Sequence, residues 1–146
     1  MRKAILLGIA IVIAMAAAAQ ATYKSNKSLY QRLGGQKAIV AVVDDFVGNV
    51  AADKRINGFF ANADIPRLKL RLVEQICAGT GGPCTYRGGS MKAVHKGLGI
   101  EDGDFDALVQ DLVKTLKKFK VPTREQKELL AILGPMRKDI VERDDG

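Results

Sequence analysis

"CAGTGGPCTYRGGSMKAVH", residues 77–95, contains both cysteines and the only histidine of this 146-residue chain. Glycines and a proline recur so densely before Ser90 that we expect no regular structure there, because both residue types end helices and favour turns. Ser90 is placed to cap a short helix that Gly97 or Gly99 closes. The stretch therefore predicts a long loop followed by a short helix that carries His95.

One histidine and two cysteines support few metal chemistries. A structural zinc site needs four Cys or His ligands with one close cysteine pair, whereas Cys77 and Cys84 are seven residues apart. The CxxCH motif of covalent c-type haem and the GxSxG motif of serine hydrolases are both missing from the sequence. Two interpretations of His95 remain: an ordinary surface or core residue, or a ligand for which one nitrogen suffices, such as the axial ligand of non-covalent haem.

The rest of the chain has helical periodicity. In residues 36–53, apolar side chains recur every three or four positions and form one stripe. No segment alternates convincingly with a period of two, so the fold class is all-α. We expect helices over 29–33 after a Ser28 cap, 36–53, 65–79, 91–99, 104–120 and 124–144, with a short helix or turn over 54–64.

Prolines and cap residues define the two C-terminal helices. The pair Val121-Pro122 ends the first of them, and Thr123 is placed to cap the second, with Gln126 completing a capping box. Pro135 lies twelve residues into this last helix, where it should kink or divide the helix because it lacks an N–H donor.

The first 21 residues have the pattern of a secretory signal peptide. Arg2 and Lys3 precede an unbroken apolar run over residues 4–19, and a small-x-small cleavage pattern follows. An uncleaved membrane anchor is the alternative, but the run is shorter than the roughly 20 apolar residues that span a bilayer. We expect residues 1–21 to be removed, a polar lead over 22–28, one domain over 29–146, and export to the bacterial periplasm with no stable membrane insertion.

The charge of the exported chain is moderate. Without Arg2 and Lys3, 23 − 2 = 21 basic residues face 16 acidic ones, a balance of about +5. The basic residues are spread along the chain and tryptophan is absent, so nucleic-acid binding has little support. Since thiols usually pair in an oxidising compartment, we expect a disulfide between Cys77 and Cys84, with redox sensing as the alternative.

An ordered set of motifs carries a family resemblance. LYQRLGG at 29–35, DDF at 44–46, FF at 59–60, RLK at 67–69, GGP at 81–83 and MKAVHKGLGI at 91–100, with Tyr86 and Gly88 between the last two, resemble the first group of truncated haemoglobins. The resemblance extends from Leu29 to Val141. It implies a two-over-two helical sandwich that encloses one non-covalent haem b per chain.

The resemblance also implies roles for individual residues. His95 matches the proximal ligand of haem iron, with its other ring nitrogen donating to a backbone carbonyl. Arg71 and Tyr86 match positions near the haem propionates, although Arg71 could equally be a solvated surface charge. The remaining haem contacts implied are Phe60, Leu68, Leu72, Met91, Ile100 and Phe105.

The distal side departs from the family pattern. Relatives commonly have a tyrosine after the phenylalanine of DDF, whereas this chain has Val47, and the positions facing iron match Leu68 and Leu72. A side chain that donates a hydrogen bond to bound O₂ contributes roughly 1.5–3 kcal/mol to the free energy of O₂ binding. Its loss would therefore weaken O₂ binding about ten- to a hundredfold. Gln75 is the nearest polar side chain that could replace the donor.

Three functions are compatible with these residues. The first is reversible binding of O₂, CO or NO by a carrier, scavenger or sensor component, with a periplasmic reductase as a partner. The second is an enzyme, an NO dioxygenase or a peroxidase-like protein, which the missing distal tyrosine disfavours. The third is transfer of haem or electrons. A helical domain without haem is the remaining alternative.

Overall fold

The computed structural model describes residues 26–143. In that range the only β-type contact is an isolated bridge between Glu101 and Arg143, so the predicted all-α class is confirmed. The elements are α2 (Leu29–Arg32), α3 (Gly35–Ala52), the 3₁₀ helix η1 (Asn57–Phe60), α4 (Ile65–Gly79), α5 (Met91–His95), α6 (Asp102–Lys118), α7 (Thr123–Leu133), the 3₁₀ helix η2 (Gly134–Met136) and α8 (Arg137–Ile140).

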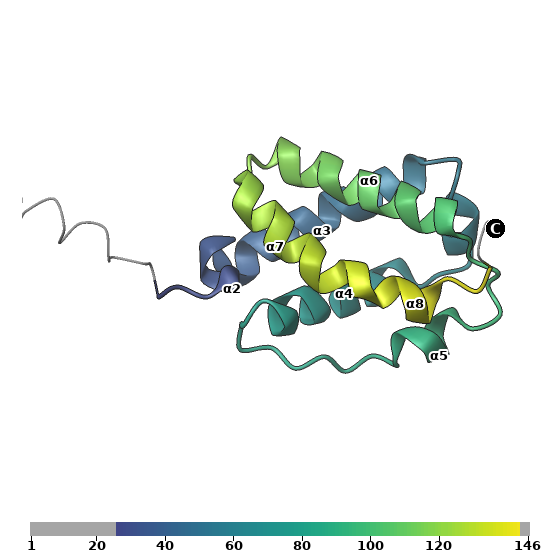
Figure 1. Ribbon diagram of the computed structural model, residues 1–146, viewed down its shortest axis with the longest axis horizontal. Helices are drawn as coiled ribbons and strands as arrows, with labels where there is room; N and C mark the ends of the chain where they lie inside the picture. Colours follow the sequence, from purple (N-terminus) through teal and green to yellow (C-terminus); the bar gives the residue numbers. More distant parts are fainter. Residues whose placement is uncertain (1–25, 144–146) are drawn as a thin grey trace, which may run out of the picture.

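Long helices stacked in pairs form the body of the molecule. α3 packs against both α4 and α6, and α2 packs against α3 and α7. Figure 1 shows α6 along the upper side, α4 and α5 in the lower half, α7 crossing in front of α3, and α8 continuing toward α5. The short α5 contacts α8, so the C-terminal part of the chain closes over the helix that carries His95.

The apolar stripe on α3 is the centre of the core. Ile39, Val43, Phe46, Val47 and Val50 are all buried. β-Branched residues lose rotamer freedom in a helix, which costs a few tenths of a kcal/mol each. Burial of such a side chain contributes about 1.5–3 kcal/mol, so packing outweighs the low helix propensity. α3 is therefore the wall against which α4 and α6 pack.

Side-chain caps begin α2 and α5 as the sequence predicts. The Ser28 hydroxyl accepts from the Gln31 N–H, and the Gln31 side chain accepts from the Ser28 N–H, which makes a reciprocal capping box. The Ser90 hydroxyl accepts from the Ala93 N–H and so caps α5. Both caps satisfy N–H groups that have no partner within the helix.

Several predicted boundaries were wrong. α6 spans Asp102–Lys118 and not 104–120, and the C-terminal helix ends at Ile140 and not at 144. Two further differences, in α5 and α7, concern the site and its support.

α5 ends at His95, before the predicted Gly97 or Gly99, because Lys96 has an extended ψ of 130°. Both glycines have positive φ, and they form the turn that leads away from the helix. His95 thus lies in the last turn of a five-residue helix.

The second of these two differences is the start of α7. Thr123 is the first helical residue, and Pro122 occupies the cap position in extended geometry, with no side-chain cap. The Gln126 side-chain amide donates to the Val121 carbonyl, so the predicted capping box does not form. Proline fixes φ near the value that a helix entry requires, and this replaces the side-chain cap. The predicted division at Pro135 is confirmed, because α7 ends at Leu133.

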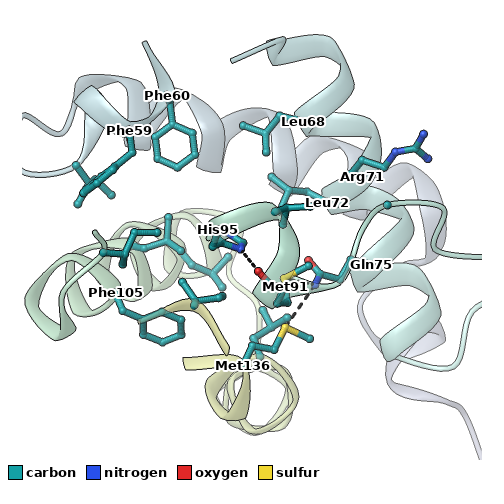
Figure 2. A pocket seen from close by; sticks show the side chains of 18 of the residues that line it. Phe59, Phe60, Leu68, Arg71, Leu72, Gln75, Met91, His95, Phe105 and Met136 are labelled. Atoms are coloured by element: carbon teal, nitrogen blue, oxygen red, sulfur yellow. Dashed lines mark hydrogen bonds between the residues drawn. The ribbon is translucent and has the colours of Figure 1, made fainter. Parts of the chain in front are cut away.

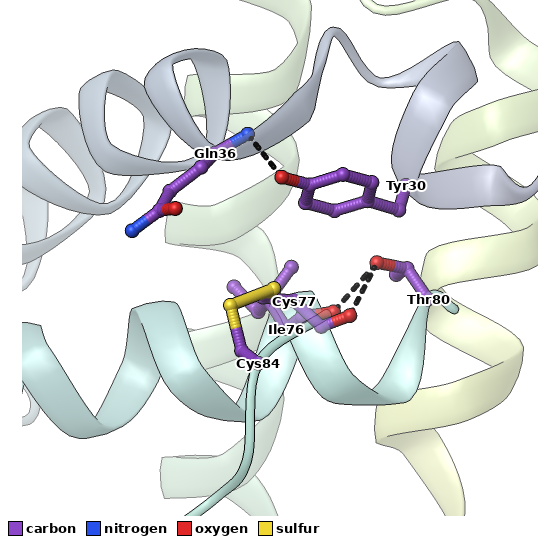
Figure 3. The surroundings of a disulfide bond; sticks show 6 residues. All are labelled: Tyr30, Gln36, Ile76, Cys77, Thr80 and Cys84. Carbon is purple, nitrogen blue, oxygen red and sulfur yellow. Dashed lines mark hydrogen bonds between the residues drawn. A yellow bond between two sulfur atoms is a disulfide. The ribbon is translucent and has the colours of Figure 1, made fainter. Parts of the chain in front are cut away.

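The loop after α4 is fastened to that helix by the Cys77–Cys84 disulfide (Figure 3). The two Cα atoms are 5.7 Å apart, and Cys77 has no exposed surface. A Cβ on Gly82 would lie 2.5 Å from the Tyr30 ring and 2.7 Å from the Cys77 sulfur, so only glycine fits there. The Tyr30 hydroxyl accepts from the Gln36 N–H at 2.9 Å, which holds the ring beside the disulfide.

Within residues 26–143, no helix combines the length and the apolar character needed to cross a bilayer. The predicted signal peptide over residues 1–21, and the polar lead as far as residue 25, lie outside the described residues.

Replacing both cysteines with alanine is expected to lower the free energy of unfolding by about 2–3 kcal/mol, because the eight-residue loop no longer restricts the unfolded chain. Urea unfolding of wild type and Cys77→Ala/Cys84→Ala, followed by circular dichroism, measures the difference. Thr85→Ala, an exposed change directly after Cys84, is the control and should stay within about 0.5 kcal/mol of wild type. Equal stability of the wild-type protein before and after reduction of the disulfide would contradict this stabilising role.

Candidate functional site

A large apolar cavity lies between α4 with η1 on one side and α5, α6 and the α7–α8 segment on the other. Its volume is about 760 Å³, within the size range of small-molecule and cofactor sites. Most of its wall consists of Phe, Leu, Ile, Val and Met side chains. Ten of the residues predicted from the sequence line it: Phe60, Leu68, Arg71, Leu72, Gln75, Tyr86, Met91, His95, Ile100 and Phe105.

His95 is held in one orientation and one tautomer. Its Nδ1 lies 2.7 Å from the carbonyl oxygen of Met91, one turn earlier in α5 (Figure 2). A carbonyl oxygen only accepts, so Nδ1 carries the proton and donates. In the neutral ring, Nε2 then keeps its lone pair, which is the form that binds a metal. The half-buried ring lines the cavity and so offers this nitrogen to a ligand inside.

The wall next to His95 consists of α5, the turn that connects α5 to α6, and α6 itself. Met91, Ile100 and Phe105 all line the cavity, and the last two are buried. The Arg137 guanidinium lies 4.5 Å from the centre of the Phe105 ring, and it also bonds to Asp102. This cation–π contact holds the aromatic ring in place as part of the wall.

The opposite wall is apolar, but it differs from the prediction at one residue. Phe60, Leu68 and Leu72 line the cavity, whereas Val47 does not. Val47 is buried in the core of α3, and its neighbour Phe46 reaches the cavity instead. Successive residues of a helix point about 100° apart, and the valine side chain is too short to bridge that difference. The wall on the α3 side therefore consists of an aromatic ring.

Charged side chains lie around Arg71. Its guanidinium donates to Glu74 at 2.7 Å, and the same carboxylate oxygen accepts from the Arg87 N–H at 3.0 Å. The Arg71 guanidinium holds the pKa of Glu74 below its usual value, and the Arg87 N–H adds to this effect. Glu74 thereby fastens the loop to α4 and fixes Arg71 at the cavity. The Tyr86 hydroxyl donates to the Gly89 carbonyl at 2.8 Å.

Gln75 does not face the apolar wall opposite His95. Its amide nitrogen lies 3.3 Å from the sulfur of Met91 and 3.4 Å from the sulfur of Met136. Figure 2 shows the amide directed toward these methionines and away from Phe60 and Leu68. The side chain thus links α4 to α5 and to η2.

The sequence interpretation missed the contribution of the C-terminal segment. Leu130, Leu133, Met136 and Ile140 line the cavity from three successive elements. Their spacing of three, three and four residues is the signal that could have identified them. Pro135 interrupts the helix there, and the pattern alone does not show that the apolar face continues across the break.

The fold and the cavity define a small helical protein with one histidine in the wall of a large apolar cavity. The model of the bacterial-like globin family matches residues 28–142. The group 1 truncated hemoglobin of Mycolicibacterium paratuberculosis is 36% identical over 119 residues, which cover 82% of this chain and 88% of the relative. The chain therefore belongs to the bacterial-like globins and, within them, to the group 1 truncated haemoglobins, as its motifs predict.

Solved structures agree with this assignment. The Fe(III) form of truncated hemoglobin from Tetrahymena pyriformis superimposes with a TM-score of 0.77 at 32% identity, over 80% of this chain and 100% of that one. The 2/2 hemoglobin from Synechococcus sp., crystallised in the cyanomet state with covalently attached heme, superimposes with a TM-score of 0.75 at 35% identity. The match covers 80% of this chain and 100% of that one. The predicted two-over-two globin fold is confirmed.

Proposed function

We propose that this protein binds one haem b non-covalently in its cavity, with His95 as the iron ligand, and reversibly binds diatomic gases there. The observation that carries the proposal is the ring of His95, whose Nδ1 donates to Met91 and whose Nε2 is left for a metal inside an apolar cavity. When bound, the haem supplies an iron with one open position for O₂, CO or NO.

The cavity wall fits such a group. Apolar and aromatic side chains on both sides exclude water, and Phe60 and Met91 are placed to pack against a large planar ring. Arg71 and Tyr86 are the candidates for its carboxylates, and Arg71 is already ordered by Glu74. The relative from Synechococcus carries covalently attached heme. This chain has no histidine besides His95, so we infer that its haem is held without a histidine linkage.

Haem titration tests the proposal. Added haemin should saturate at one equivalent per chain by Soret absorbance, and all of it should extract into an organic solvent at acid pH, because no covalent bond retains it. The loss of Soret binding in Leu72→Arg, which puts a charge into the apolar wall, would tie the band to this cavity. A helical protein that shows no saturable Soret band, or haem that resists extraction, would contradict the proposal.

We propose further that the side of the cavity opposite His95 offers no hydrogen-bond donor to the gas. Phe46, Leu68 and Leu72 line that side, and none of them carries an N–H or O–H in its side chain. O₂ is the gas that gains most from a donor, at roughly 1.5–3 kcal/mol, whereas CO and NO gain less. The chain should therefore bind CO and NO well relative to O₂, which suits a carrier, scavenger or sensor component better than an enzyme that needs a stable oxy form.

We also propose export to the periplasm. The residue pattern over 1–21 supports it. The Cys77–Cys84 disulfide supports it independently, because disulfides persist in oxidising compartments. A reductase in the same compartment would then be the partner that keeps the iron ferrous.

Installing the missing hydrogen-bond donor should shift the gas preference toward O₂. In Val47→Tyr, the longer side chain can reach past the α3 wall into the cavity, and its hydroxyl should slow O₂ dissociation about ten- to a hundredfold. Val47→Phe is the matched control, since it adds the same ring without the hydroxyl. Stopped-flow displacement of O₂ by CO measures both variants. Equal O₂ dissociation rates in the two variants, or a wild-type rate already as slow as that of Val47→Tyr, would overturn the apolar-side proposal.

A further inference from the structure

Gln75 is a polar side chain in an otherwise apolar part of the cavity wall, and two thioethers occupy its donors. Its Nε2 lies 3.3 Å from Met91 Sδ and 3.4 Å from Met136 Sδ. The three residues come from α4, α5 and η2, so the contact joins segments that are far apart in the sequence. A primary amide has two N–H donors, one for each sulfur.

These two bonds set where the amide points. Leu72 and Gln75 are three residues apart in α4, so their side chains share one helix face, and both line the cavity. Figure 2 shows Leu72 between Gln75 and Leu68, with the Gln75 amide turned toward the methionines. A thioether is a weak acceptor, so the amide is held by weak bonds and a stronger acceptor in the cavity would compete for it.

We propose that Met91 and Met136 are specificity-determining residues, because their sulfurs retain the Gln75 amide and keep its N–H donors away from the bound gas. This inference rests on the proposed haem and gas binding and explains how the side opposite His95 stays without a hydrogen-bond donor although a glutamine lines the cavity. Met91 and Met136 lie on the His95 side, at α5 and η2, so the retained amide stabilises the packing of these elements against α4. The effect on the gas is indirect and acts through Gln75.

Met136→Leu separates the two roles. Leucine keeps the apolar volume but cannot accept a hydrogen bond, and Met91, whose carbonyl orients His95, is left unchanged. With one of its two acceptors removed, the Gln75 amide should reach the gas in part of the molecules and slow O₂ dissociation about three- to tenfold. Gln75→Leu gives the reference rate without the amide, and Gln75→Leu/Met136→Leu should match that reference, since no Gln75 donor remains to reach the gas.

The outcomes distinguish this inference from the proposed function. An O₂ dissociation rate in Met136→Leu equal to wild type, or a slow rate that persists in the double variant, overturns the inference. A slow wild-type rate that Gln75→Leu leaves unchanged overturns only the proposal that the side opposite His95 lacks a hydrogen-bond donor. A slow wild-type rate that rises in Gln75→Leu overturns both, because the amide would then already contact the gas.

The haem-free protein provides a second readout. In ¹⁵N-labelled full-length protein, the side-chain amide pair of Gln75 is the ¹H–¹⁵N signal pair that disappears in Gln75→Leu. Met136→Leu should shift that pair, since one N–H loses its sulfur partner, while the Gln126 pair, bonded to the Val121 carbonyl, should stay in place. A Gln75 pair that does not move in Met136→Leu means that the sulfur contact does not hold the amide, and it overturns the inference without any gas or haem present.

Discussion

The hydrogen bond from His95 Nδ1 to the Met91 carbonyl is the constraint on which the function of the cavity depends. It fixes the tautomer, so the lone pair is on Nε2, and it fixes the ring within a helix of only five residues. So short a helix has little stability of its own, because helix formation has a costly nucleus. The surroundings must therefore hold α5 in place, and its packing against α8 and the Ser90 cap do so.

α4 organises most of those surroundings. Cys77 fastens the start of the loop, Glu74 accepts from the Arg87 N–H further along the loop, and Gln75 reaches across to Met91 in α5 itself. Leu68 and Leu72 of the same helix form the opposite wall of the cavity. One helix thus positions the loop, the histidine helix and the face on which the gas would lie, and a shift of α4 would alter all three together.

Local signals predicted much of this structure. The apolar stripe of α3, the caps at Ser28 and Ser90 and the break at Pro135 depend on residues close in sequence, and all three predictions hold. The prediction for Val47 was wrong and the direction of Gln75 was left open, and both depend on geometry that spacing does not contain. Whether Phe46 or Val47 reaches the cavity is decided by the rotation of α3 and by side-chain length, and the direction of Gln75 is decided by two sulfurs that are 16 and 61 residues away. Ten of the predicted site residues nevertheless line one cavity, because the resemblance supplied tertiary placement that periodicity could not.

The central claim is that His95 Nε2 binds haem iron in this cavity. Resonance Raman spectroscopy of the ferrous, gas-free protein tests it most directly, because the iron–histidine stretch reports the bond itself. We expect this band in the wild-type protein, its disappearance in His95→Gly, and the return of a band when imidazole fills the space left by the side chain. A haem-loaded wild-type protein without an iron–histidine band, or a ferrous spectrum that His95→Gly leaves unchanged, would contradict the account.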